Sequence, residues 1–295
     1  MKAKYVDPFT DFGFKKIFGE QASKPMLIDF LNSLLPESKI VDLTFKDKEK
    51  LGMTDANRNA VYDIYCENIN GEKIIVELQK AKQNYFRDRT VYYSTFPIQE
   101  QAQKGSWDFQ LKYVYCIGIL DFKFEDVKLG KEEVIHTVQL KDQNNQIFYD
   151  KLKFVYIEMP NFNKEQTELS TRLDKWLYFL KHLVDFEIIP EIFKDNIFVE
   201  AFKKAEIANY SYDEQNQYQQ SLKTYRDYVN TFDYAFQDGR NQGIEQGIKE
   251  GLEKGIEQGY IKSKFNVINT GIDLGIGIEQ LSKLTGLTIS EIENY

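Results

Sequence analysis

Two residue types on which much enzyme chemistry depends are scarce in this chain. Its 295 residues include only two histidines and two cysteines. His136 and His182 are too few for a histidine-rich metal centre and argue against histidine-dependent catalysis, so we interpret both as structural or surface residues. Cys66 and Cys116 lie in apolar, strand-like runs, which is typical of reduced core thiols. We therefore predict a cytoplasmic protein.

Long apolar runs are also missing. No segment approaches the ~20 apolar residues that a membrane-spanning helix needs, so we expect no membrane partner. The N-terminal segment MKAKYVDPFTDFGFKK has no apolar signal-peptide core, which argues against secretion. Strings typical of P-loop nucleotide hydrolases and of α/β-hydrolase nucleophile elbows do not occur. By contrast, 22 Phe and 19 Tyr are enough to build a sizeable core.

The charge of the chain is unevenly distributed. The net charge is −8, which is not the balance of a strongly basic nucleic-acid-binding protein. Residues 1–110 hold 16 basic and 16 acidic side chains, so the whole acidic excess lies in residues 111–295. A local basic surface in the first part therefore remains compatible with nucleic-acid binding, and the acidic part is the better candidate for protein contacts.

Hydrophobic periodicity predicts an α/β domain over residues 1–160. Helices are expected at 12–18, from Ser23 as N-cap to Pro36, and at 84–104 with a kink at Pro97. Strands are expected at 60–67, 73–79, 113–122, 134–140 and 148–157. Residues 161–238 are predicted to be a helical extension, with helices at 169–184, 188–209 and 213–236.

Glycine recurs at every fourth position from Gly239 to Gly259. Each glycine costs about 1 kcal/mol in a helix relative to alanine, so residues 239–260 are either a flexible or partly helical linker or a helix that self-associates into a homo-oligomer. Residues 261–295 are predicted to form a small helical segment. Its pattern allows a DNA-reading helix-turn-helix, but with few basic residues there we favour plain helical packing.

The strongest candidate for a reactive site is the predicted hairpin around Asn70-Gly71. Pairing about this turn places Asp63 opposite Glu77, with Gln79 on the same face. Two opposed carboxylates repel each other unless a cation lies between them, and Mg²⁺ is the natural ion for oxygen ligands. The backbone carbonyl of Leu78 is a candidate third ligand. The alternative is a half-exposed hairpin that carries two solvated acids.

Basic and aromatic residues flank this hairpin on both sides. Such mixtures suit the phosphate backbone of a nucleic acid, although a solvated helix face gives the same pattern. The candidate DNA-binding residues are Arg58, Lys80, Lys82, Arg87 and Arg89, with Lys46, Lys48 and Lys50 in the upstream part of the basic rim.

Taken together, these strings resemble the PD-(D/E)XK nuclease family transposases, a group related to the recombination-promoting nucleases. The matching segments are Asp7-Pro8, TDFGFKKIFG (10–19), Asp63-Ile64-Tyr65, Glu77-Leu78-Gln79, RDRTVYY (87–93), the glycine repeat and the Thr-Gly-Leu-Thr segment near the C-terminus. The resemblance implies a restriction-endonuclease-like mixed sheet flanked by helices and metal-dependent cleavage of DNA phosphodiesters.

The same resemblance assigns roles to residues. Asp63 and Glu77 would be metal ligands for Mg²⁺, with Mn²⁺ as the alternative ion, and Asp11, or less favourably Glu20, would be an additional acid. Gln79 stands where the wider superfamily has lysine. A lysine stabilises developing negative charge, whereas glutamine only orients water by hydrogen bonding, although Lys82 is a candidate substitute cation.

Three functional hypotheses follow from the sequence. The first is a Mg²⁺-dependent DNA endonuclease of the transposase or recombination-promoting type. The second is a catalytically silent DNA-binding or self-assembling protein that retains the nuclease fold, as the Gln79 replacement and the acidic C-terminal part suggest. The third, a toxin-like nuclease in phage defence, uses the same site and is not separable by sequence.

Overall fold

A computed structural model describes residues 3–50, 59–80, 85–102, 105, 108–124 and 132–294 of the chain. The described residues fall into two compact units, Met1–Tyr225 and Arg226–Tyr295. The first unit contains every strand among the described residues, and the second is helical.

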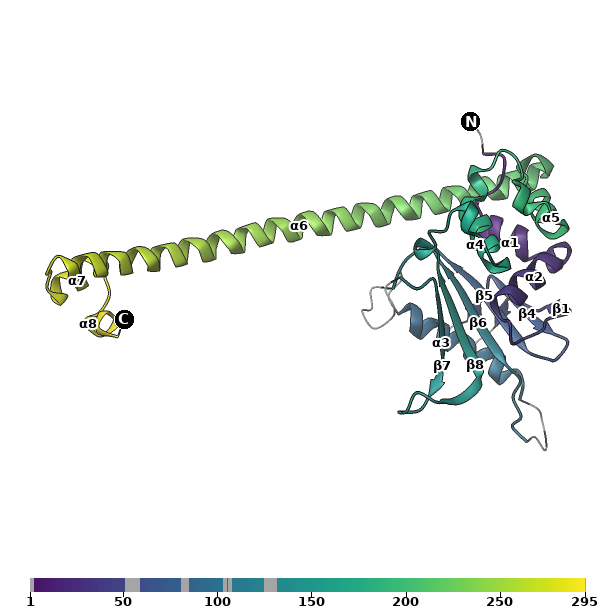
Figure 1. Cartoon of the computed structure of the whole chain (residues 1–295), viewed down its shortest axis with the longest axis horizontal. Coiled ribbons are helices and arrows are strands. Elements are labelled where there is room, and N and C mark those ends of the chain that lie inside the picture. Colours follow the sequence, from purple (N-terminus) through teal and green to yellow (C-terminus); the bar gives the residue numbers. More distant parts are fainter. Residues whose placement is uncertain are drawn as a thin grey trace. The chain divides into compact units, whose positions relative to one another are not determined.

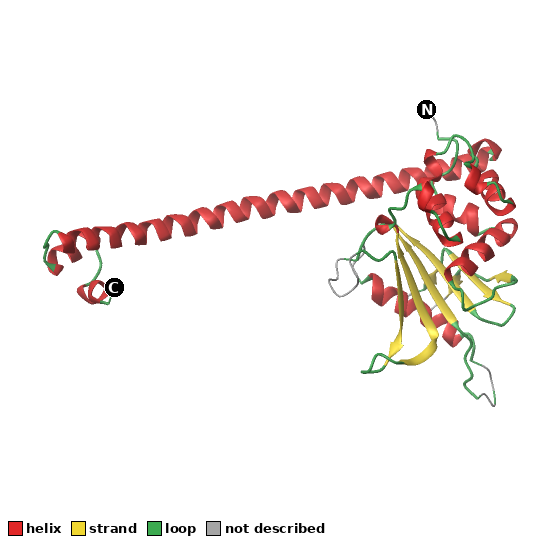
Figure 2. Ribbon diagram, viewed as in Figure 1, coloured by secondary structure: helices red, strands yellow, loops and turns green. Residues whose placement is uncertain are grey.

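The first unit is built on a mixed six-stranded sheet in the order β1-β4-β5-β6-β8-β7 (Figures 1 and 2). Strands β5, β6 and β8 are parallel neighbours, while β1, β4 and β7 run antiparallel to theirs. The bounds are β1 Leu43–Phe45, β4 Ile64–Asn68, β5 Lys73–Gln79, β6 Val114–Leu120, β7 Ile135–Lys141 and β8 Ile147–Glu158. A separate short pair joins β2 (Glu49–Lys50) and β3 (Ala60–Val61).

Helices cover both faces of this sheet (Figure 1). Four of them share one hydrophobic core with the sheet, because their apolar residues lie along one side at helical spacing. They are α1 (Asp11–Phe18), α2 (Lys24–Leu34), α4 (Arg172–His182) and α5 (Asn196–Ala205). The other face packs on α3 (Phe86–Gln99), whose Phe86 joins a second core with Tyr65, Ile75 and Tyr156. The predicted mixed α/β sheet flanked by helices is confirmed.

The hairpin of β4 and β5 has the predicted register. Ile64 pairs with Val76 and Tyr65 with Ile75, which corresponds to pairing about the Asn70-Gly71 turn. Gly71 takes a positive φ of 78°, a conformation that favours glycine. The prediction of one continuous strand over 60–67 was wrong, because the chain bends between β3 and β4. Asp63 therefore lies just before β4 and not within a strand.

Three helix predictions also need correction. The helix predicted at 84–104 is α3, which ends at Gln99, two residues after Pro97. The helix predicted at 188–209 is a short 3-10 turn followed by α5, because the chain turns at Pro190 and again at the N-cap Asp195. Ser23 occupies the N-cap position of α2, but its side chain makes no capping bond, since its hydroxyl donates to the Lys16 carbonyl instead.

The second unit consists of helices. Helix α6 (Tyr212–Asp273) starts in the first unit and includes all six glycines of the repeat. It is followed by α7 (Ile278–Thr285) and α8 (Ile289–Glu293), which pack against the end of α6 through Ile268, Leu281 and Ile292. Among the described residues, every helix is too short or too polar to cross a membrane.

Candidate active site

Asp63 and Glu77 meet where β5 ends and β4 begins. Because β4 runs antiparallel to β5, the bend before β4 lies beside the carboxyl end of β5. The Asp63 carboxylate accepts a hydrogen bond from the Leu78 backbone N–H at 2.8 Å. The Glu77 carboxylate accepts one from the Asp63 backbone N–H at 3.2 Å. Each acid is thus held by the backbone beside the other acid, which brings the two predicted ligands together.

The two carboxylates are partly buried and repel each other. Both side chains keep some solvent exposure, but protein atoms surround their carboxylates closely. Burial raises the pKa of Asp63, and burial together with the charge of Asp63 raises the pKa of Glu77. The Lys15 ammonium lowers the pKa of both acids, but the net shift stays upward. A cation bound between the carboxylates would remove this repulsion.

The donor chemistry of this pair fits a hard divalent ion. Asp63 and Glu77 offer carboxylate oxygens, which Mg²⁺ and Mn²⁺ prefer. In an extended strand the N–H and C=O of one residue point to the same edge. The Leu78 carbonyl is therefore directed toward the edge where its N–H meets Asp63. Across the described ranges no group of three or more His, Cys, Asp or Glu side chains could hold a metal, so such an ion would depend on these two acids, a carbonyl and water.

Gln79 is buried at the end of β5 and is engaged by α3. Its Oε1 accepts a hydrogen bond from the Arg89 guanidinium. Arg89 also lies 5.8 Å from the ring centroid of Tyr93, within the range of a cation–π contact. A positive charge thus stands next to Gln79, although it comes from another element and was predicted only as a DNA contact.

The other predicted site residues lie at several places. Arg87 stacks on Phe124 at 4.6 Å from the ring centroid. Lys80 lies 4.6 Å from the ring centroid of Tyr225 and within electrostatic reach of Asp63. Asp11 opens α1 and pairs with Lys15 at 2.6 Å. Of the remaining predicted contacts, Arg58 and Lys82 lie outside the described residues.

One site feature was missed by the sequence analysis. An open pocket of about 610 Å³ brings together α1, the segment after β1, the end of β5 and the first turns of α6. Lys15, Lys16, Lys48 and Lys80 line it, together with Asp11. Two of these lysines, Lys15 and Lys48, lie within electrostatic reach of Asp63. The sequence signals for the pocket were the Lys15-Lys16 pair next to candidate acid Asp11 and the basic-rim residues Lys48 and Lys80, but no local pattern brought them together.

Comparison with known proteins agrees with this geometry. The sequence profile of one family, described as PD-(D/E)XK nuclease family transposase, matches residues 8–235. No curated protein and no solved structure matches the chain. The match spans the six-stranded sheet, its covering helices and the two acids, which is consistent with the fold of these nucleases. The chain belongs to the PD-(D/E)XK nuclease family transposases.

Proposed function

We propose that this protein is a metal-dependent DNA endonuclease that hydrolyses phosphodiester bonds at Asp63 and Glu77. Family membership supports a nuclease-type function acting on DNA. The observation that carries the metal-dependent step is the pair of mutually repelling carboxylates, each anchored to the backbone beside the other. Mg²⁺ is the expected ion and Mn²⁺ the alternative, because both favour oxygen ligands.

Each site residue has a distinct task in this proposal. Asp63, Glu77 and the Leu78 carbonyl hold the ion, which when bound supplies Lewis-acid polarisation and a lowered pKa for water. The backbone bonds to the two acids keep their carboxylates in place before an ion arrives. Gln79 orients water or phosphate by hydrogen bonding, and Arg89 fixes its amide. Asp11 is a candidate additional acid that must first release Lys15.

The direct experiment is plasmid cleavage by purified protein with Mg²⁺, with Mn²⁺ and with EDTA. Asp63→Asn and Glu77→Gln should each lower cleavage by about 100-fold or more, since they remove a metal ligand. Both variants should stay folded with an unchanged or higher melting temperature, because the substitution also removes a repelling charge. Asp88→Asn, at an exposed acid of α3, is the matched control and should cleave normally. Equal nicking by all variants would point to a contaminant.

Gln79 supports the second candidate function, a catalytically silent DNA-binding protein. Its amide is already engaged by Arg89, so neither its charge nor its geometry reproduces a lysine at that position. Metal-independent DNA retention without cleavage in Mg²⁺ or Mn²⁺ would favour this candidate. The expected DNA contacts in either case are Arg58, Lys80, Lys82, Arg87 and Arg89, and binding should weaken as salt rises.

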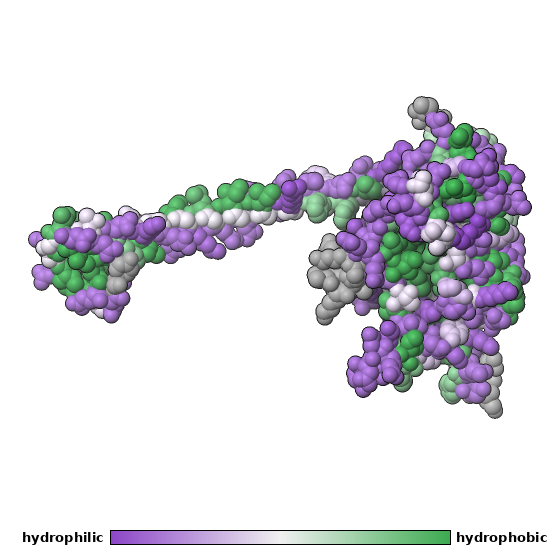
Figure 3. All heavy atoms as spheres, viewed as in Figure 1, coloured by the Kyte–Doolittle hydropathy of each residue, from purple (hydrophilic) through white to green (hydrophobic). Residues whose placement is uncertain are grey.

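We also infer that the glycine-repeat part of α6 mediates self-association. Among the described residues, Cβ atoms built at its six glycines would meet nothing within 4 Å. A row of exposed apolar residues follows the glycines, which appears as a green band in Figure 3 and consists of Ile244, Ile248, Leu252 and Ile256. Light scattering of the full chain should show a smaller particle for Ile248→Glu/Leu252→Glu than for the unaltered protein. An identical mass for both would reject this assembly.

The two cysteines of the chain are free and buried. This supports the proposed cytoplasmic location, where thiols stay reduced.

A further inference from the structure

The pocket between α1, the segment after β1, the end of β5 and the first turns of α6 is lined by more basic than acidic side chains. Four lysines reach it from three separate parts of the chain, whereas Asp11 and Glu20 are the acids that line it. Lys15 and Lys16 come from α1, Lys48 from the segment after β1, and Lys80 from the end of β5. Clustered lysines repel one another, so this arrangement does not stabilise the hydrophobic core.

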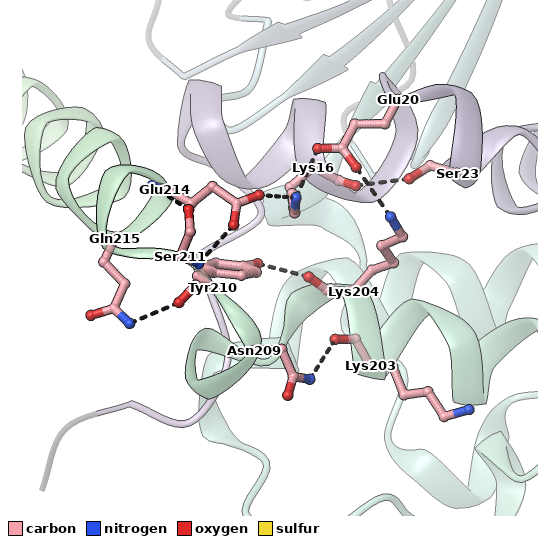
Figure 4. Close-up of polar contacts among 10 residues, drawn as sticks. All are labelled: Lys16, Glu20, Ser23, Lys203, Lys204, Asn209, Tyr210, Ser211, Glu214 and Gln215. Carbon is pink, nitrogen blue, oxygen red and sulfur yellow. Dashed lines mark hydrogen bonds and ion pairs between the residues drawn. The ribbon is translucent and has the colours of Figure 1, made fainter.

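Among the pocket lysines, Lys16 has a structural role. Its side chain is 12% exposed and pairs with Glu20 at 2.9 Å and with Glu214 at 2.5 Å. Figure 4 shows Lys16 between these two carboxylates, with Lys204 on the other side of Glu20. Lys16 therefore ties α1 to the start of α6 and has little capacity to bind a ligand.

Lys15, Lys48 and Lys80 are differently placed. Among the described residues Lys15 forms an ion pair with Asp11 alone, and this pair is exposed, so it is weak and can exchange. For Lys48 and Lys80, no carboxylate within the described part of the chain lies at ion-pair distance. Burial and the neighbouring Lys15 charge lower the pKa of Lys48, while the charges of Asp11 and Asp63 raise it. The Lys48 and Lys80 ammonium groups would both gain from an anion.

The convergence of the lysines indicates which kind of anion fits. Several ammonium groups that line one open pocket favour a ligand with more than one anionic oxygen. The phosphodiester backbone of the proposed substrate is such a ligand.

We propose that this pocket is a phosphate-binding subsite for a nucleic-acid strand, with Lys15, Lys48 and Lys80 as its ligands. The inference rests on the proposed function for the identity of the strand. In this proposal Lys15 of α1 and Lys48 of the segment after β1 supply positive charge that the neutral Gln79 side chain does not. Gln220 and Ser221 of α6 also line the pocket and can donate hydrogen bonds to the backbone of the strand, whereas the Thr224 hydroxyl donates to the Gln220 carbonyl.

Binding and cleavage should be measured separately on the full chain. In EDTA, a short fluorescein-labelled single-stranded oligodeoxynucleotide is titrated, with inorganic pyrophosphate as competitor. Lys15→Met and Lys48→Met should each weaken binding by about 5- to 10-fold and lower the salt slope by about 1. The double variant should lose about 30-fold or more, and pyrophosphate should displace the strand from the unaltered protein.

Lys39→Met removes an exposed lysine elsewhere and is the matched control, which should bind as the unaltered protein does. Unchanged affinity and salt slope in Lys15→Met/Lys48→Met, or no binding by the unaltered protein, would overturn the subsite. Lysine-dependent binding without cleavage in Mg²⁺ or Mn²⁺ would support the subsite and reject hydrolysis. Normal cleavage by both lysine variants, with unchanged binding, would reject the subsite and leave hydrolysis standing.

Discussion

The two units of this protein are both rich in helix, but they stabilise their helices in different ways. In Met1–Tyr225 the helices bury apolar side chains against a sheet, and Trp176 alone contacts the rings of Phe18, Phe179 and Phe198. In Arg226–Tyr295 the buried apolar cluster consists of Ile268, Leu281 and Ile292. The glycine-repeat part of α6 contributes nothing to it.

This difference shows what each unit needs for stability. Helices of the first unit tolerate poor formers such as Phe and Thr, because tertiary packing outweighs propensity. The six glycines of α6 together cost about 6 kcal/mol relative to alanine, and no packing in the described chain offsets this. The repeat is therefore the part of the fold for which we propose a partner helix.

The largest effect should follow from removing the central aromatic of the first unit. Trp176→Ala creates a cavity among four aromatic rings and leaves Asp29 without the indole N–H that it accepts at 2.6 Å. We expect a loss of about 3–5 kcal/mol in the free energy of unfolding, measured with urea. Phe236→Ala, at a 60% exposed aromatic of α6, is the control and should change stability little. Comparable losses in both would contradict the contrast between the units.

A glycine substitution in the second unit tests its small core. A Cβ at Gly271 would lie 2.3 Å from a Leu281 methyl, and Leu281 is 1% exposed. Gly271→Ala should destabilise the packing of α7 on α6 by about 1–3 kcal/mol. Hydrogen exchange at the amides of α7 and α8 would detect it as lost protection, with the sheet unaffected. Retained protection would show that α7 repacks freely.

The pH dependence of the first unit should include the capping box of α4. Burial alone would raise the pKa of Asp174, but its bonds to Lys164 and to the Thr171 backbone hold it at about 2. Since this is below the unfolded value of 3.8, the stabilisation is present above pH 3.8 and is lost as the pH falls toward 2. Asp174→Asn should lower the free energy of unfolding by about 2 kcal/mol at neutral pH, and the loss of stability between pH 3.8 and pH 2 should become smaller.

Urea titrations between pH 2 and pH 6 compare the unaltered protein with Asp174→Asn directly. Parallel stability curves for the two proteins would show that Asp174 does not contribute the expected proton linkage.

The smallest expected effect is a gain in helix stability rather than a loss. Gly251→Ala adds a methyl group to a glycine with open surroundings, so the isolated helix should gain about 1 kcal/mol. Circular dichroism of the full chain at low concentration should show a higher midpoint for thermal loss of helix. If a second helix packs on the glycine row, the same substitution should instead weaken assembly at high concentration. This result would sharpen the comparison between the two units, because it would show that a partner helix supplies the packing that the glycine repeat lacks in the single chain.

Local rules accounted for much of the first unit. The alternation in 73–79 and the Asn70-Gly71 turn predicted the hairpin register, because side-chain periodicity and turn type together leave one alignment. They did not predict the bend at Asp63, since the strand-like alternation continues across it. The capping role of Ser23 was wrong because its hydroxyl has a tertiary acceptor, the Lys16 carbonyl.

The sequence by itself determined the fold class, the pairing of Asp63 with Glu77 and the glutamine at position 79. These features depend on short-range periodicity and on residue type. Only the tertiary structure decided that Arg89 engages Gln79 and that Lys15, Lys48 and Lys80 share one pocket. Those residues are far apart in the chain or lie on different elements. Their proximity follows from sheet order and helix packing, which burial energy selects over the whole domain and no local pattern encodes.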